Sequence, residues 1–95
     1  MRLFLRLTTD VNERLRKLMR YHGELSRYID DALTNTNLVT VDLLPIVDSR
    51  DVPGMTAVIS GRANASLRAA ARQRGCSITT LANSAIHYWL RGKDI

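Results

Sequence analysis

One pattern of apolar residues occurs twice in this chain of 95 residues, and this duplication limits the folds open to it. Apolar residues recur at i, i+4, i+7 and i+8, the spacing of one face of an amphipathic helix. The first stripe consists of Val11, Leu15, Leu18 and Met19, and the second, 52 residues later, of Ala63, Leu67, Ala70 and Ala71. A glycine follows each stripe, Gly23 and Gly75. Glycine tolerates the left-handed backbone that ends many helices, so we expect two matched helices with matched ends.

A second apolar stripe follows each glycine, now with an offset of 53 residues, so the second turn is one residue longer. These stripes consist of Leu25, Ile29, Ala32 and Leu33 in the first half and of Ile78, Ala82, Ala85 and Ile86 in the second. Ser26 in the first half and Ser77 or Thr79 in the second are suitable N-caps. Each half is therefore predicted to end in a second amphipathic helix.

Ahead of each first helix the apolar period changes from about 3.6 to 2, which is typical of a strand with one buried face. The apolar positions are Leu3, Leu5, Leu7 and Met55, Ala57, Ile59; the alternating positions are Arg2, Phe4, Arg6 and Thr56, Val58, Ser60. The chain is expected to enter its first helices at Thr8 to Asp10 and at Ser60 to Gly61. A unit of roughly 38 residues seldom folds unaided, and a lone strand leaves both edges unpaired. We therefore expect the two strands to pair above four interlocked helices.

The predicted fold is mainly α with a two-stranded antiparallel ribbon, built from a duplicated strand-helix-helix unit. Residues 1–37 and 54–95 are the two repeats, 38–53 are a linker packed on the body, and together they form one compact domain. The linker is too rich in apolar residues for a free tether, and Pro45 blocks a helix there. Its length permits strand pairing within one chain or between two.

The charge of the chain points to a polyanionic partner. Its 14 basic and 9 acidic residues give a net charge of +5, and no acid lies between Val52 and Lys93. Most of the basic residues are arginines, which bind phosphate and guanine in a planar, bidentate way. An unpaired basic half suggests a nucleic acid or an acidic surface, with plain solubility as the alternative.

Other function classes lack support in the sequence. No apolar run of about 18 residues is present, and the single Cys76 suits a reducing compartment, so we expect a cytoplasmic protein without a membrane partner. His22 and His87 have no neighbour at metal-ligand spacing, and no catalytic constellation or phosphate-binding glycine loop is recognisable. The expectation is a protein that is not an enzyme and has no metal or other cofactor.

The segments around both predicted turns resemble a known superfamily. The first half reads Arg6-Leu7-Thr8-Thr9-Asp10-Val11, then Gly23, then Leu25-Ser26-Arg27-Tyr28-Ile29-Asp30-Asp31-Ala32-Leu33. The second half, with Gly75-Cys76-Ser77-Ile78-Thr79-Thr80-Leu81-Ala82, is similar but more divergent. Together they resemble the ribbon-helix-helix (MetJ/Arc) superfamily in a tandem, single-chain, pseudo-dimeric form of TraY-like architecture. The resemblance implies a ribbon in the DNA major groove and phosphate held at the start of each second helix.

The same resemblance implies two sets of site residues. The DNA base contacts would be Arg2, Phe4, Arg6, Thr56, Val58 and Ser60. The DNA phosphate contacts would be Leu25, Ser26, Arg27, Ser77, Ile78 and Thr79. Arginine can bond bidentately to guanine, hydroxyls bond several bases, and valine meets the thymine methyl group. The two half-ribbons differ, so the bound DNA site should lack palindromic symmetry. Instead of contacting DNA, Phe4 could pack against the linker or against an oligomer partner.

The function implied is sequence-specific binding of double-stranded DNA by a bacterial transcriptional repressor that regulates its own operon. One alternative is an accessory protein of plasmid transfer, which marks an origin of transfer and recruits a relaxase. Another is an antitoxin whose partner is a toxin, with the linker as its only candidate binding segment. A second copy of this chain, bound at an adjacent DNA site, is a further possible partner.

Overall fold

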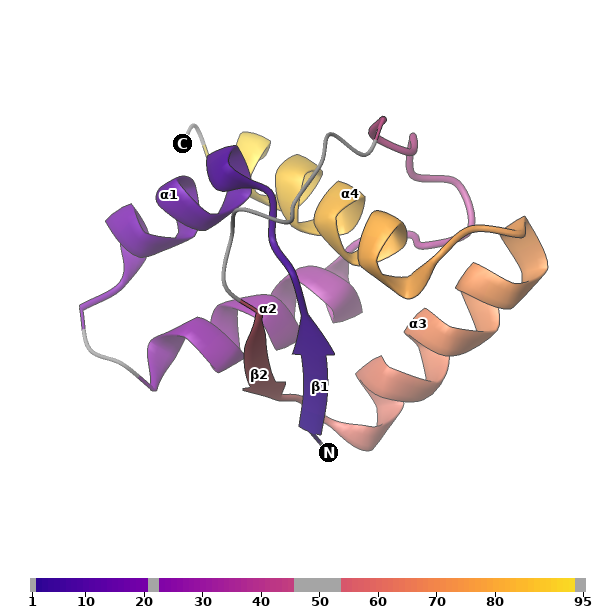
Figure 1. Ribbon diagram of the computed structural model, residues 1–95, viewed down its shortest axis with the longest axis horizontal. Coiled ribbons are helices and arrows are strands. Elements are labelled where there is room, and N and C mark those ends of the chain that lie inside the picture. The colour runs from indigo at the N-terminus through magenta and orange to yellow at the C-terminus, as the bar shows by residue number, and fades with distance from the viewer. Residues whose placement is uncertain (1, 21–22, 46–53, 94–95) are drawn as a thin grey trace.

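The computed structural model describes residues 2–20, 23–45 and 54–93 of the chain (Figure 1). The elements follow in the order β1 (Arg2–Leu5), α1 (Thr9–Leu18), α2 (Glu24–Asn35), β2 (Met55–Val58), α3 (Gly61–Arg74) and α4 (Ile78–Arg91). The described residues thus form four helices and one two-stranded antiparallel sheet. The predicted mainly helical class with a two-stranded ribbon is confirmed. None of these helices is long and apolar enough to cross a membrane, as far as the described residues go.

The two strands pair antiparallel within the chain, and their side chains alternate as predicted. The register pairs Arg2 with Val58, Leu3 with Ala57, Phe4 with Thr56 and Leu5 with Met55. Leu3, Leu5 and Ala57 are buried, whereas Arg2, Phe4, Thr56 and Val58 are exposed. The side chain of Met55 lies outside what the structure describes. One face of the sheet therefore joins the core and the other faces solvent.

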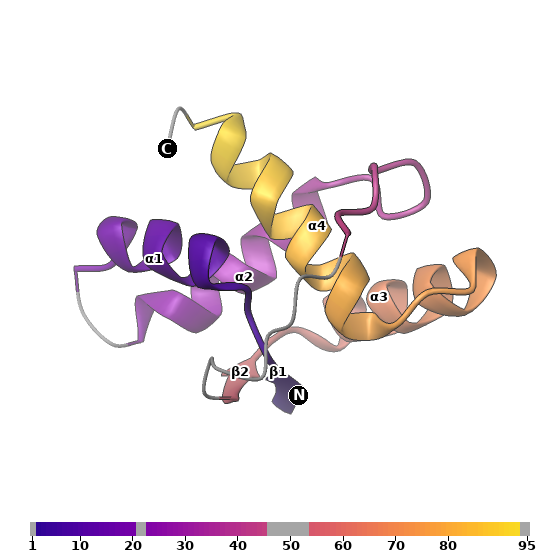
Figure 2. The same cartoon turned by 45° about the horizontal axis from the view of Figure 1, so that its top comes forward.

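The helices interlock beneath the sheet. In Figures 1 and 2, α2 and α4 cross at the centre of the molecule, while α1 and α3 lie at opposite ends. Helix α1 packs against α4 as well as α2, and α3 packs against α2 as well as α4. Neither half of the chain could keep its apolar surface covered without the other half.

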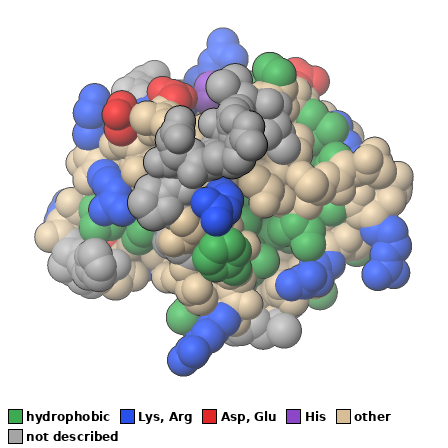
Figure 3. Space-filling view, viewed as in Figure 1, with side chains coloured by type: hydrophobic (Ala, Val, Ile, Leu, Met, Phe, Trp, Pro, Cys, Tyr) green, Lys and Arg blue, Asp and Glu red, His purple; other side chains and the backbone are tan. Residues whose placement is uncertain are grey.

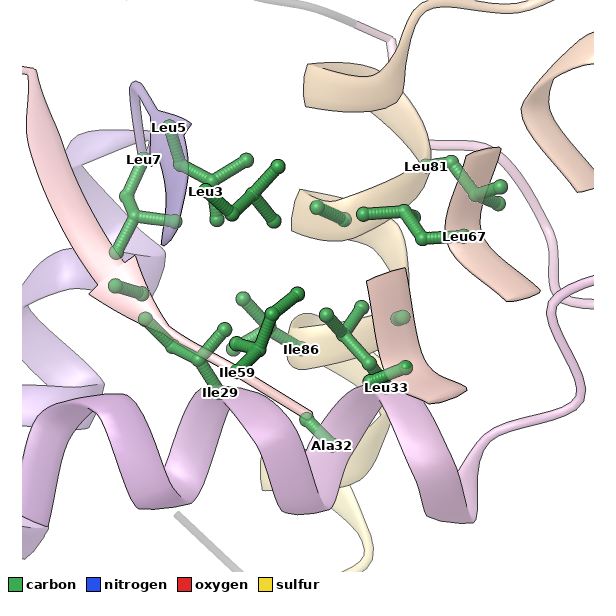
Figure 4. Close-up of a cluster of buried hydrophobic side chains, with 14 of the residues drawn as sticks. Leu3, Leu5, Leu7, Ile29, Ala32, Leu33, Ile59, Leu67, Leu81 and Ile86 are labelled. Atoms are coloured by element: carbon green, nitrogen blue, oxygen red, sulfur yellow. The ribbon is translucent and has the colours of Figure 1, made fainter. Parts of the chain in front are cut away.

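The core lies where the sheet meets the two central helices. Figure 4 shows leucines of the β1 segment, Ile29, Ala32 and Leu33 of α2 and Ile86 of α4 around one common interior, and all belong to one buried cluster. All are buried, and removing one of the leucine or isoleucine side chains from water contributes about 2 kcal/mol to the free energy of unfolding. Because these residues come from both halves of the chain, the core stabilises the whole molecule as one unit.

Three of the helices begin and one of them ends as the sequence predicts. The hydroxyls of Thr8, Ser60 and Ser77 cap α1, α3 and α4 by accepting the backbone N–H three residues on, at 3.3, 3.1 and 3.0 Å. Gly75 ends α3 with a φ of 65°, the left-handed conformation for which glycine has no steric penalty.

The predictions for Gly23 and Ser26 are wrong. Helix α1 ends at Leu18, and Gly23 has a φ of −69° as the N-cap of α2. Ser26 therefore lies inside the first turn of α2. The reason is Glu24, whose buried carboxylate accepts the backbone N–H of Arg20 at 3.0 Å and the hydroxyl of Tyr28 at 2.7 Å. An acid at the positive end of a helix stabilises it, and α2 starts there.

Residues 38–45, the described part of the predicted linker, lie against α3 and α4. Leu38 is buried, and the Arg74 guanidinium donates to the carbonyl oxygens of Leu38 and Val41 at 3.1 and 2.6 Å. The backbone N–H of Leu44 donates to the Ser84 hydroxyl of α4 at 2.9 Å. The rest of the predicted linker, residues 46–53, lies outside the described residues.

Candidate nucleic-acid interface

The solvent face of the β-ribbon combines arginines with two exposed apolar side chains. Phe4 and Val58 are 61% and 60% exposed, and Thr56, Arg2 and Arg6 are exposed beside them. Exposed apolar side chains on a regular sheet are typical of surfaces that contact a partner. The structure thus brings five of the six predicted base-contact residues onto one face.

The sixth, Ser60, lies outside strand β2, and its base contact stays a prediction. Ser60 follows the end of β2 and caps α3, so its hydroxyl is already engaged with the N–H of Ala63. Its N–H and hydroxyl also donate to Asp30 Oδ1 of α2, at 2.9 and 3.0 Å. Ser60 holds the start of α3 on α2.

Gly54 is the third position of this face on the second strand segment, at the end opposite to Ser60. Counting the strand register one step outwards places Gly54 opposite Arg6. The ring of Phe4 lies over Gly54 so closely that a Cβ at this position would overlap the far edge of the ring. The sequence repeat could have identified Gly54 as a residue of this face. Gly54 lies 52 residues after Arg2, and 52 is the offset that relates the two strands and the two first helices.

The phosphate contacts predicted in the first half are placed unfavourably. Leu25 is buried, and the Ser26 hydroxyl accepts the backbone N–H of Val58 at 3.0 Å, which ties α2 to β2. Arg27 is exposed. The carboxylate of Glu24 lies at the N-terminus of α2, and through its hydrogen bond it raises the pKa of the Tyr28 hydroxyl. A phosphate here would meet a negative charge.

The phosphate contacts predicted in the second half are better placed. Ser77 is exposed, and Ile78 and Thr79 are partly exposed at the N-terminus of α4. The first turn of α4 contains no acid. The first N–H groups of a helix have no partner within it, and they point at the positive end of the helix dipole. The start of α4 is therefore open to an anion in a way that the start of α2 is not.

Buried polar side chains tie the ribbon to the helices, and the sequence reasoning missed them. Asn83 of α4 is only 3% exposed; it accepts the N–H of Thr8 at 2.9 Å and donates to the carbonyl oxygen of Arg6 at 3.0 Å. It also donates to the Thr79 carbonyl oxygen at 2.8 Å. Asn83 thus fixes the chain directly after β1, where Arg6 leaves the sheet.

Charge is distributed unevenly over the surface. On the face shown in Figure 3, Lys and Arg side chains lie over the ribbon and α3 and also on the α1 side, whereas the acidic side chains in view lie only along the upper edge. Helix α3 contributes Arg62, Arg68 and Arg72, all exposed, and its first turn contains no acid. The positive potential of this face therefore extends from the ribbon onto α3.

A histidine contact holds α1 on α4 away from the ribbon. The Arg14 guanidinium lies 2.9 Å from Nδ1 of His87 and 3.1 Å from Asp10 Oδ2. A guanidinium only donates, so Nδ1 is the acceptor and the imidazole is neutral. Burial, and then the charge of Arg14, lower the pKa of His87. No group of three His, Cys, Asp or Glu side chains within the described ranges could hold a metal.

This contact makes stability depend on pH. Because the pKa of His87 is lowered in the folded protein, its contribution to stability is present above pH about 6.5 and is lost as the pH falls through the lowered value. We expect the free energy of unfolding to fall more between pH 7.5 and 5 in the wild type than in His87→Gln, measured by urea denaturation. Parallel dependence of the free energy of unfolding on pH in the two proteins would contradict this. His22 is present in both proteins, so its titration cancels in the comparison.

The architecture and this surface define a small, mainly helical protein that presents an arginine-bearing two-stranded ribbon to solvent. Comparison with known protein families, with curated proteins and with solved structures finds no match for this chain.

Proposed function

We propose that the chain is a duplicated ribbon-helix-helix protein that binds double-stranded DNA with its ribbon in the major groove. The observation that carries the proposal is the strand register. At the offset of 52, Thr56 is the counterpart of Phe4, and these two residues face each other. The same offset makes Met55 the counterpart of Leu3 and Ala57 the counterpart of Leu5. A twofold rotation about the ribbon centre therefore exchanges the pair Leu3 with Ala57 for the pair Leu5 with Met55. A pseudo-twofold axis through the ribbon centre is what a duplicated unit requires.

A pair of matching hydrogen bonds supports the same axis. The N–H of Thr8 donates to Asn83 Oδ1, and the N–H of Ser60 donates to Asp30 Oδ1, both at 2.9 Å. Thr8 and Ser60 differ by 52 positions, and Asp30 and Asn83 by 53, the two offsets of the sequence repeat. Corresponding residues thus make corresponding contacts across the two halves.

The exposed face of the ribbon suits DNA in shape and chemistry. The major groove is about 12 Å wide and admits a two-stranded ribbon. Arg2 and Arg6 can bond the guanine edge bidentately, and Val58 can contact a thymine methyl group. The arginines of α3 and the start of α4 add phosphate contacts beside the groove. The role that we propose is that of a transcriptional repressor, which acts by occupying DNA at a promoter and catalyses no reaction.

Selection of bound duplexes from a random pool tests the proposal. We expect the wild type to enrich one motif without palindromic symmetry, and Arg6→Ala to lose preference for one guanine by about tenfold. The control Arg72→Ala, on the exposed face of α3, should weaken binding to all sequences alike and lower the salt slope by about 0.9. Failure of the wild type to enrich any sequence at low salt would overturn the proposal.

A further inference from the structure

The side chain of Phe4 reaches diagonally across the ribbon and does not lie beside the residue that pairs with Phe4 on the other strand. Its paired residue is Thr56, but its ring covers Gly54, two residues earlier on the other strand. Diagonal neighbours of an antiparallel pair are within reach of an aromatic side chain. Only glycine leaves this space open. Phe4 nevertheless stays 61% exposed, so the ring forms part of the solvent face.

The same ring lies beside Arg6. The guanidinium carbon of Arg6 is 5.9 Å from the centroid of the Phe4 ring, within the range of a cation–π contact. An exposed arginine side chain otherwise has many rotamers, and ordering it opposes binding. The Asn83 amide holds the carbonyl oxygen of Arg6 at 3.0 Å, so both ends of this residue are contacted.

We infer that Phe4 is a positioning residue, which holds the Arg6 guanidinium ready for one guanine, and that Gly54 makes room for the ring. The inference rests on the proposed DNA binding. Arg2 provides an internal comparison: it is an arginine on the same face of the same strand, but it pairs with Val58. The two arginines should therefore read their base pairs with different selectivity, and the base pair read by Arg6 should be the more strictly defined.

The first test compares motifs selected from the same random duplex pool. Arg2→Ala and Arg6→Ala identify the guanine read by each arginine. Phe4→Leu and Gly54→Ala should both reduce the preference at the Arg6 guanine about threefold and leave the Arg2 guanine unchanged. Phe4→Tyr, which keeps an aromatic face, should retain the preference. The control Val39→Ala shortens an exposed apolar side chain outside the ribbon and should leave both guanines unchanged.

Two outcomes would overturn the inference while leaving the proposed function intact. One is an Arg6-dependent guanine that Phe4→Leu does not affect. The other is an equal loss at the Arg2 and Arg6 guanines, which would mean that Phe4 acts on the ribbon as a whole. Circular dichroism of each variant shows whether the fold is retained.

The second test needs no DNA and separates the two proposals. A nearby aromatic ring shifts the proton resonances of the groups beside it, so the Arg6 side chain should show ring-current shifts in the free wild type. They should disappear in Phe4→Leu and shrink in Gly54→Ala, where the new Cβ displaces the ring. Arg6 resonances at ordinary positions in the wild type would overturn the inference even if a DNA motif is enriched. Shifts without any enriched motif would confirm the contact but overturn its role in base reading.

Discussion

Asn83→Asp should lower the free energy of unfolding by about 3 kcal/mol, which for a chain of this size corresponds to a fall in Tm of roughly 15 °C. The Asn83 amide nitrogen donates to the carbonyl oxygens of Arg6 and Thr79, at 3.0 and 2.8 Å. Aspartate puts a charged oxygen against both carbonyl oxygens at a site that is 3% exposed. The Thr8 N–H still donates to one carboxylate oxygen, but the other oxygen faces only acceptors, and a buried charge paired so poorly is among the most destabilising changes that a single substitution makes.

The pH dependence of this variant follows from the same contacts. Burial beside two carbonyl oxygens raises the pKa of the new carboxyl in the folded state above its unfolded value of about 3.9. The deficit of the variant is therefore smallest below pH about 3.9 and grows as the pH rises towards the folded pKa. Urea denaturation at pH 3.5 and 7, followed by circular dichroism, measures both effects.

The matched control is Asp30→Asn at the corresponding position of α2. There the side chain only accepts hydrogen bonds, from the N–H and the hydroxyl of Ser60. An amide oxygen can accept them as well, so the cost should stay below about 1 kcal/mol. Equal effects of the two substitutions, or an Asn83→Asp protein as stable as the wild type, would contradict the role assigned to Asn83.

If the chain binds DNA as proposed, Val58→Arg should make its base preferences more symmetric. At the offset of 52, Val58 is the counterpart of Arg6, and its side chain is 60% exposed on the same face. The added guanidinium should give the second half-site a preference for guanine of about tenfold, the discrimination expected from one bidentate contact. Motifs selected from a random duplex pool, compared with the wild-type motif, measure the change.

Val39→Arg is the control for the added charge. Val39 is 49% exposed and lies in the segment after α2, away from the ribbon. Its extra charge can strengthen binding to all sequences through phosphate, but it should add no base preference. A new guanine selected by both variants, or by neither, would argue that Val58 does not face the bases.

Local elements of the fold could be predicted because each depends on residues close together in sequence. The stripe through Leu25, Ile29 and Leu33 has the helical period, and all three side chains are buried. The hydroxyls of Thr8 and Ser77 stand one turn before the groups that they cap. The left-handed Gly75 follows from its position after a helical stripe.

Other features depend on polar contacts that the apolar pattern does not contain, and the pattern gave them incompletely or wrongly. Helix α2 starts at Glu24 because that carboxylate binds the N–H of Arg20 and the hydroxyl of Tyr28. Ser60 looked like a strand residue by alternation alone, but Asp30 of α2 and the first turn of α3 engage it. Gly23 matched Gly75 in spacing, yet it begins a helix instead of ending one.

The candidate site divides in the same way. Alternation in the sequence alone determined that Arg2, Phe4 and Arg6 share one face of a strand, since side chains two residues apart always do. Only the tertiary structure decided which residues stand opposite them, because the strand register is set by packing of both halves around α2 and α4. That register brings Gly54 under the Phe4 ring and next to Arg6, a contact between residues 50 positions apart that no local pattern contains.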